Sequence, residues 1–142
     1  MKSFHLDILS PERPFYSGEC VSLVVPISDG MFGILAGHTP ITAAIQDGEL
    51  LFTLPDGTRR SCAVTRGIVD VSRDNVRVLC VTAVAPEEID EEAERLAMQE
   101  AMLEISEKKG REDYMLSQLA FARAFNNLKV KQHDAARNVE HQ

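Results

Sequence analysis

The chain has 142 residues, of which 44% are hydrophobic and 26% are charged, and its formal net charge at pH 7 is −7. This composition is typical of a folded globular protein, and the length allows one ordinary domain, or one small domain with an appendage. The acidic charge argues against nucleic acid as the main partner, because phosphate neutralisation needs a basic surface. No run approaches the roughly 18 apolar residues of a membrane span. The N-terminus has no apolar signal core, so we expect a cytosolic setting.

The first half of the chain alternates apolar and polar residues with period two, which predicts β-strands. The predicted strands cover residues 4–8, 21–25, 42–45, 50–54, 61–64, 68–71 and 76–84. Turn signals separate them, among them Pro55-Asp56-Gly57-Thr58, in which proline presets φ and glycine accepts a positive φ. Short strands at this spacing predict a sandwich or flattened barrel over residues 1–84.

One stretch in this half is unlike the strands around it. Gly30 to Pro40 holds three glycines, a histidine and four large apolar side chains within eleven residues. Glycine permits backbone angles and close approaches that a Cβ forbids. We interpret the stretch as a loop that is either tucked into a core or offered to a partner.

After Ala85-Pro86 the pattern becomes helical. Residues 87–109 contain no glycine or proline, and Gly110 follows them, which predicts a helix over this range. Six of the eight residues from Glu87 to Glu94 are acidic, and negative charge is favourable at the N-terminus of a helix. A second helix is predicted from Glu112 to about Lys131, followed by a polar, frayed tail over 132–142. The short Gly-Arg connection makes the two helices antiparallel neighbours. Their many alanines bury little area, so we expect a helical hairpin that detaches easily.

The residues that could bind a metal, a phosphate or a redox partner are better explained by structural roles. His5 and Asp7 share one strand face, and His38 is the residue that could join them at a metal, but satisfied surface residues are the favoured interpretation. Cys20, Cys62 and Cys80 lack zinc or redox spacing and predict buried free thiols. The glycines are not followed by Lys-Ser/Thr, so no phosphate loop is predicted. No catalytic residue, cofactor or metal site is expected.

The second helix carries a basic face that allows two interpretations. Arg123, Lys129 and Lys131 offer positive charge to an acidic partner surface. The other interpretation is that these residues compensate the C-terminal helix dipole and make the protein soluble. From their spacing alone, this interpretation is favoured over a partner contact.

Several motifs together carry a family resemblance over about residues 4–130. The densest runs from Val24-Val25-Pro26 through Asp29-Gly30-Met31-Phe32-Gly33-Ile34-Leu35-Ala36-Gly37-His38-Thr39-Pro40. Others are Gly67-Ile68-Val69-Asp70-Val71, Ile89-Asp90 and Phe121-Ala122-Arg123-Ala124. With these motifs the chain resembles the epsilon subunit of bacterial F-type ATP synthases.

The resemblance implies an all-β N-terminal sandwich of ten strands and a C-terminal antiparallel two-helix hairpin. It implies that one end of the sandwich binds the gamma subunit and that the glycine-rich stretch rests on the membrane c-ring. The implied c-ring contacts are Asp29, Gly30, Met31, Phe32, Gly33, His38 and Pro40. It further implies that the hairpin, when extended, brings Arg123, Lys129 and Lys131 to an acidic segment of a catalytic beta subunit of the alpha/beta head and inhibits ATP hydrolysis.

Three departures from the family pattern change these expectations. Leu35-Ala36-Gly37-His38 lacks the usual proline and so some rigidity, and Met31 replaces a residue that is often acidic, which shifts the contact toward apolar character. ATP-binding relatives carry Ile/Leu-Asp-x-x-Arg-Ala on the first helix. Here Ile89 and Asp90 are followed by Ala93 instead of arginine and by surplus carboxylates, so we expect weak or absent ATP binding at Ile89, Asp90 and Arg123.

The sequence therefore predicts a non-catalytic rotor subunit of a proton-translocating ATP synthase. We expect it at the cytoplasmic face of the bacterial plasma membrane, held there by its partners, since it has no anchor of its own. The alternative is a stand-alone β-sandwich that binds a small ligand, with the helical hairpin as a lid.

Overall fold

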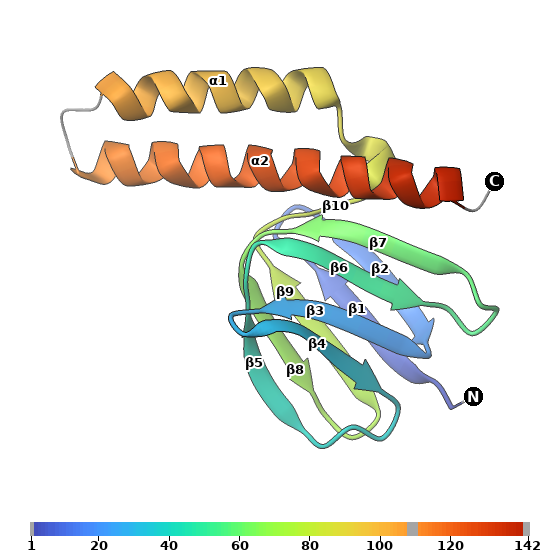
Figure 1. Ribbon diagram of the computed structural model, residues 1–142. Coiled ribbons are helices and arrows are strands. Elements are labelled where there is room, and N and C mark those ends of the chain that lie inside the picture. The colour runs from blue at the N-terminus through green and yellow to red at the C-terminus, as the bar shows by residue number, and fades with distance from the viewer. Residues whose placement is uncertain (1, 108–110, 141–142) are drawn as a thin grey trace. The chain divides into compact units, whose positions relative to one another are not determined.

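The computed structural model describes residues 2–107 and 111–140. The chain divides into two compact units, Met1–Ala85 and Pro86–Gln142. The first unit consists of strands and the second of helices (Figure 1). The change of sequence period at Ala85-Pro86 thus coincides with the division between the units.

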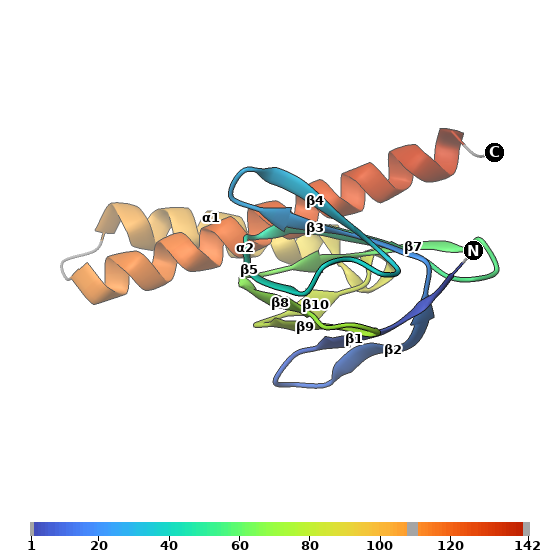
Figure 2. The same cartoon turned by 90° about the horizontal axis from the view of Figure 1, so that it is seen from below.

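The first unit is a sandwich of two five-stranded sheets, seen as two layers in Figure 2. Sheet A has the order β2-β1-β9-β8-β5 and sheet B the order β10-β7-β6-β3-β4. The strands are β1 (Phe4–Leu9), β2 (Pro14–Cys20), β3 (Ser22–Ile27), β4 (Gly30–Leu35), β5 (Ile41–Ile45), β6 (Gly48–Thr53), β7 (Arg59–Val64), β8 (Gly67–Val71), β9 (Asn75–Cys80) and β10 (Ala83–Val84). The predicted fold, a ten-stranded sandwich with a C-terminal helical hairpin, is confirmed.

Alternating side chains from both sheets fill the space between the layers. In β1, Phe4, Leu6 and Ile8 are buried, whereas His5 and Asp7 between them are part-exposed. Leu23 and Val25 of β3 face them from the other sheet and are fully buried. The three cysteines are buried free thiols, as predicted. Burial raises the pKa of the Cys80 thiol to about 11, so the thiol is protonated and unreactive at neutral pH.

Two predictions about strands were incomplete. No strand is predicted between residues 8 and 21, because Pro14 and Gly18 mask the weak alternation of β2. In the structure β2 is an edge strand, and the Arg60 guanidinium lies 5.4–5.7 Å from the ring centroids of Phe15, Tyr16 and Phe52, which fixes this edge to sheet B. The predicted strand 76–84 is two strands, because the chain crosses from sheet A to sheet B at 81–82.

The second unit begins with a short 3-10 helix, η1 (Pro86–Glu88), followed by α1 (Glu91–Glu107) and α2 (Arg111–Glu140). Asp90 caps α1: its Oδ1 accepts hydrogen bonds from the backbone N–H groups of Glu92 and Ala93, at 3.0 and 3.3 Å. The predicted end of the second helix near Lys131 was wrong. Residues 132–140 contain no glycine or proline to stop the helix, and their polarity is compatible with an exposed helix surface. The predicted cap at Gly110 lies outside the described residues.

Polar side chains contact each other between the two helices of the hairpin. Asn127 Nδ2 donates to Glu94 Oε1 at 3.1 Å, and Ser117 Oγ donates to Glu104 Oε2 at 3.0 Å. The large apolar side chains of Leu96 and Phe125 are 56% and 51% exposed. Small residues such as alanine let two helices approach closely, and the larger side chains then point outward. No helix in the described part of the chain is long and apolar enough to cross a membrane.

Candidate functional site

The glycine-rich stretch is a strand and a short turn, not one continuous loop. Gly30–Leu35 forms β4 and pairs antiparallel with β3 in a regular register from Ile27–Gly30 to Ser22–Leu35. Gly30 has φ of +123°, which lets the chain reverse over Ser28 and Asp29 and return as a strand. The prediction of a loop was wrong for these six residues, because the glycines hid the period-two pattern in which Ile34 is buried and its neighbours are exposed.

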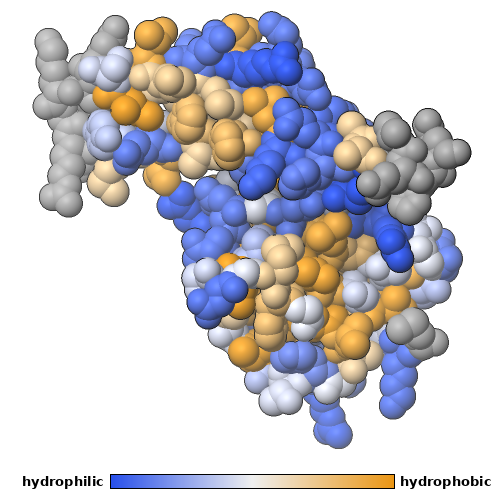
Figure 3. Space-filling model, in the orientation of Figure 1, coloured by the Kyte–Doolittle hydropathy of each residue, from blue (hydrophilic) through white to orange (hydrophobic). Residues whose placement is uncertain are grey.

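Side chains of β4 divide between the two faces of sheet B. Met31 and Leu35 point outward and are 55% and 57% exposed. Phe32 points inward, packs against the core and meets the His38 ring edge-on, with 5.3 Å between ring centroids. His38 Nδ1 donates to the Thr39 carbonyl at 2.7 Å, so its orientation is fixed by the turn. Figure 3 shows hydrophobic side chains gathered over β3, β4 and β6.

The residues predicted to contact the c-ring fall into two groups along β4. Asp29, Gly30 and Met31 lie at the β3–β4 turn, whereas His38 and Pro40 follow the opposite end of the strand. A six-residue strand spans roughly 17–20 Å. β5 then runs back, since Gln46 N–H donates to the Pro26 carbonyl and Pro26 is opposite Met31. The structure therefore brings Phe32 to His38 but keeps Asp29 distant from Pro40.

A polar cluster lies on the outer face of sheet A, around Asp7. Ser17 Oγ donates to Asp7 Oδ1 at 2.6 Å, and His5 Nε2 lies 3.1 Å from the same oxygen. The Ser17 hydroxyl, followed by His5 and Arg77, holds the pKa of Asp7 below its usual value. Glu19 adds a second carboxylate at 3.9 Å from His5 Nδ1. Sequence reasoning found His5 and Asp7 but missed Ser17, which only strand pairing brings opposite Asp7.

This cluster supports neither a metal site nor a nucleophile. His38 belongs to the turn after β4 and bonds to Thr39, so it does not join His5 and Asp7. Within residues 2–107 and 111–140, no group of three His, Cys, Asp or Glu side chains is arranged to hold a metal ion. The Ser17 hydroxyl donates to the Asp7 carboxylate at 2.6 Å and lies 3.5 Å from His5 Nε2. Because the pKa of Asp7 is held below its usual value, this carboxylate is a weak base for activating the hydroxyl.

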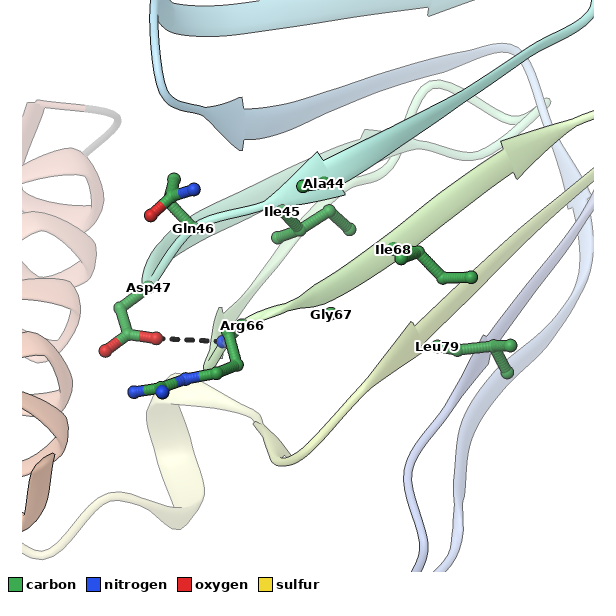
Figure 4. Close-up of a pocket in the computed structure, with 8 residues that line it drawn as sticks. All are labelled: Ala44, Ile45, Gln46, Asp47, Arg66, Gly67, Ile68 and Leu79. Atoms are coloured by element: carbon green, nitrogen blue, oxygen red, sulfur yellow. Dashed lines mark hydrogen bonds between the residues drawn. The ribbon is translucent and has the colours of Figure 1, made fainter. Parts of the chain in front are cut away.

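An open groove of about 720 Å³ crosses the outer face of sheet A (Figure 4). Ala44, Ile68 and Leu79 stand side by side on β5, β8 and β9 and form its apolar floor. At one end the Asp47 carboxylate accepts a hydrogen bond of 2.8 Å from the Arg66 backbone N–H. The groove was not predicted, because its residues come from three strands and only the register aligns them.

The basic residues of α2 are in unequal situations. Arg123 and Lys129 are exposed, whereas Lys131 is half-buried and its Nζ donates to the Pro86 carbonyl at 2.9 Å. Ile89 is buried, and Asp90 is occupied as the cap of α1. Of the three residues considered for ATP, Arg123 alone has an exposed charged side chain without an assigned structural role.

Comparison with known proteins decides the family. The family model described as "ATP synthase, Delta/Epsilon chain, beta-sandwich domain" matches residues 3–86. The chain belongs to the ATP synthase epsilon-chain family. It is 34% identical over 129 residues to the ATP synthase epsilon chain of Caldanaerobacter subterraneus subsp. tengcongensis, covering 91% of this chain and 94% of the relative. It is 40% identical over 114 residues to that of Nitrobacter winogradskyi, covering 79% and 82%.

Solved structures show the same fold. The chain superposes with a TM-score of 0.73 on a chain from the cryo-EM structure of the Euglena gracilis mitochondrial ATP synthase, OSCP/F1/c-ring, at 20% identity, covering 94% of this chain and 81% of that one. A chain of the Tetrahymena thermophila mitochondrial ATP synthase central stalk/c-ring gives 0.62 at 11% identity, covering 92% and 97%. The predicted family is confirmed: the chain belongs to the ATP synthase epsilon chains by sequence.

Proposed function

We propose that this epsilon chain is a non-catalytic stalk subunit that joins the catalytic head of an ATP synthase to its membrane c-ring. The observation that carries the proposal is the epsilon-chain match over about nine-tenths of the chain. The gamma subunit binds the sandwich, and the peripheral location at the cytoplasmic membrane face follows from these partners.

The proposed c-ring contact is built on β4 and its two ends. Met31 and Gly33 form an uncharged outer surface, with Asp29 and Gly30 at the near turn. Phe32 supports His38 from inside, and Pro40 leads into β5. Since Met31 is more than half exposed and carries no charge, the contact depends on apolar burial, worth about 25 cal/mol per Å².

The proposed inhibitory contact uses α2 in a detached state. Arg123 and Lys129 are exposed and available to an acidic surface of the beta subunit. Lys131 becomes available only when its hydrogen bond to the Pro86 carbonyl breaks. Unpairing the hairpin also breaks the Glu94–Asn127 and Glu104–Ser117 bonds. All three bonds have a charged partner, so they contribute about 1.5–3 kcal/mol each, and contacts with the beta subunit must offset this loss when the hairpin detaches.

ATP binding to the hairpin is not part of the proposal. The Asp90 carboxylate is used in capping α1, and Ala93 supplies no cation. Isothermal titration of the full chain with ATP is expected to show no micromolar binding, and a micromolar dissociation constant would contradict this part of the proposal.

Reconstitution tests the stalk role and the inhibitory role separately. The ATP synthase is assembled in liposomes without this chain, with the full chain, or with a version ending at Pro86. Loss of proton-coupled ATP synthesis without the chain, and its recovery with both versions, is the result expected of a stalk subunit. Faster ATP hydrolysis with the shortened version than with the full chain is the result expected of an inhibitory hairpin. Equal hydrolysis rates would refute inhibition but leave the stalk role intact.

The stand-alone ligand-binding alternative receives no specific support. The sheet A groove has the volume of a small-molecule site, but its floor is an open row of three apolar side chains with one polar end. Recovery of the purified chain with gamma and c-ring subunits, without a bound small molecule, is the outcome that separates the two functions.

A further inference from the structure

The free edge of β4 is the least protected sheet edge in the part of the chain that the structure describes. β4 pairs only with β3, and its six residues include no charge, no proline and no break in register. The other edges carry such features: β2 begins at Pro14, contains Glu19 and lies opposite a register shift, β5 directly follows Pro40, and β10 has two residues. Charges, prolines, irregularities and short length are the features that keep edge strands from pairing with other chains.

Backbone groups of alternate β4 residues point to this free edge. The Pro26 carbonyl accepts from Gln46 N–H and therefore points away from β4. Pro26 is opposite Met31, so this is a non-hydrogen-bonded pair in the β3–β4 ladder. The N–H and C=O groups of Met31, Gly33 and Leu35 then face outward, except that the Leu35 carbonyl accepts from His38 N–H at 3.2 Å.

We propose that β4 pairs antiparallel with β4 of a second copy of this chain, joining two copies of sheet B into one ten-stranded sheet. Directly opposite residues must point to the same sheet face. A two-fold axis at Gly33 meets this requirement. It places Gly33 opposite Gly33 of the second copy, and Met31 opposite Leu35 of the second copy. The two Gly33 residues exchange two hydrogen bonds, and Leu35 N–H donates to the partner's Met31 carbonyl at each end.

The net charge of −7 on each chain does not oppose this contact, because the paired segments themselves are uncharged. No charged residue lies in Gly30–Leu35, so the paired segments bring no like charges together. The nearest one, Asp29, lies beyond the end of β4, and the antiparallel arrangement places the two Asp29 residues at opposite ends of the contact. Met31 and Leu35, both more than half exposed in one chain, cover each other on the outer face. The edge can therefore satisfy its own hydrogen-bonding groups in a second copy without bringing like charges together.

The contact is short, so the dimer is weak and forms in the unassembled chain at high concentration. One six-residue strand is well below the interface size of stable complexes, so we expect a dissociation constant on the order of 100 µM. The dimer would cover Gly30, Met31 and Gly33, which the proposed function assigns to the c-ring, but the dimer itself does not depend on that assignment.

Sedimentation velocity of the full chain tests the proposal from 5 to 500 µM. The wild type is expected to shift toward the dimer mass over this range. Gly33→Lys is expected to remain monomeric, because two lysines meet at the two-fold axis; the substitution is sterically allowed, since Gly33 has no positive φ and an added Cβ meets no atom within 4 Å. Ile68→Lys is the matched control: it adds the same charge at a 42% exposed apolar site in the sheet A groove and should dimerise like the wild type.

Crosslinking provides an independent readout of the register. Gly33→Cys places two thiols on hydrogen-bonded partners whose Cα atoms are about 5.5 Å apart, within the range that a disulfide spans. Mild oxidation is expected to give a covalent dimer on a non-reducing gel, whereas Ile68→Cys and the wild type, whose native cysteines are buried, should not. A wild type that stays monomeric at 500 µM, or a dimer lost in Ile68→Lys and retained in Gly33→Lys, would overturn the proposal.

Discussion

Replacing Gly67 with alanine should damage the sandwich severely, because β8 and β9 approach each other closely at this residue. A Cβ on Gly67 would lie 1.9 Å from the Leu79 carbonyl oxygen and 2.7 Å from the Cys80 Cα. Both are backbone atoms, and real Cβ contacts essentially never fall below 3.0 Å, so the strands must separate by about 1.1 Å.

The magnitude follows from what this separation breaks. Val81 N–H donates to the Arg66 carbonyl at 3.2 Å, and Thr65 N–H donates to the Thr82 carbonyl at 3.1 Å. A displacement of 1 Å takes both beyond hydrogen-bond distance, at about 1 kcal/mol each, and overpacking adds about 1–3 kcal/mol. We therefore expect a loss of about 4 kcal/mol in the free energy of unfolding of the sandwich.

Thiol labelling measures this loss in the sandwich alone. All three cysteines lie in the first unit and are buried, so a labelling reagent reacts when the sandwich opens. Since each 1.4 kcal/mol is a factor of ten, Gly67→Ala should be labelled roughly 10²- to 10³-fold faster than the wild type. Gly33→Ala is the control: its Cβ meets no atom within 4 Å, and labelling should slow slightly or stay unchanged. Labelling of Gly67→Ala within threefold of the wild-type rate would refute the steric argument.

Three further changes have defined outcomes. Ser17→Ala removes the main cause of the lowered Asp7 pKa and should reduce stability by about 1 kcal/mol at neutral pH. The contribution is fully present above the unfolded pKa of Asp7 near 4 and is lost as pH falls through the lower folded pKa. The stabilities of the two proteins in urea titrations should therefore converge only when the pH is below the folded pKa of Asp7. Asp90→Ala should cost about 1 kcal/mol in α1 stability, seen as reduced helical circular dichroism on heating, whereas an unchanged melt would contradict the cap. Lys131→Met should speed amide exchange in the hairpin several-fold by freeing the Pro86 carbonyl, and exposed Lys129→Met should not.

The position of β4 changes how the glycine-rich stretch is understood. As a loop, it would present one compact tip to a partner. As an edge strand, it presents a linear surface roughly 17–20 Å long with Met31 near one end and Leu35 at the other. A partner that contacts Asp29 and Pro40 at the same time must therefore extend along the strand. This constraint applies to the proposed c-ring contact.

Local patterns in the sequence were sufficient for the division into units and for an all-β first unit, and the family resemblance supplied the ten-stranded sandwich. Period-two alternation in 4–8 and 21–25 identified strands, and the helix formers after Pro86 identified the hairpin, because these signals act over a few neighbouring residues. The fully buried Leu6, Ile8, Leu23 and Val25 followed from the same alternation. The motifs around Gly30 and His38 indicated the family whether this stretch forms a strand or a loop, because they are patterns of residue types alone.

Pairing between distant residues was decided by the tertiary structure alone. The strand state of β4 depends on β3 as its partner, the Asp7 cluster on Ser17 from β2, and the groove floor on the register of Ala44, Ile68 and Leu79. Whether Lys131 is free or bound depends on a carbonyl 45 residues away. A residue's own neighbours set its backbone preference, but hydrogen-bond register and burial are set by residues that the chain brings close only when it folds.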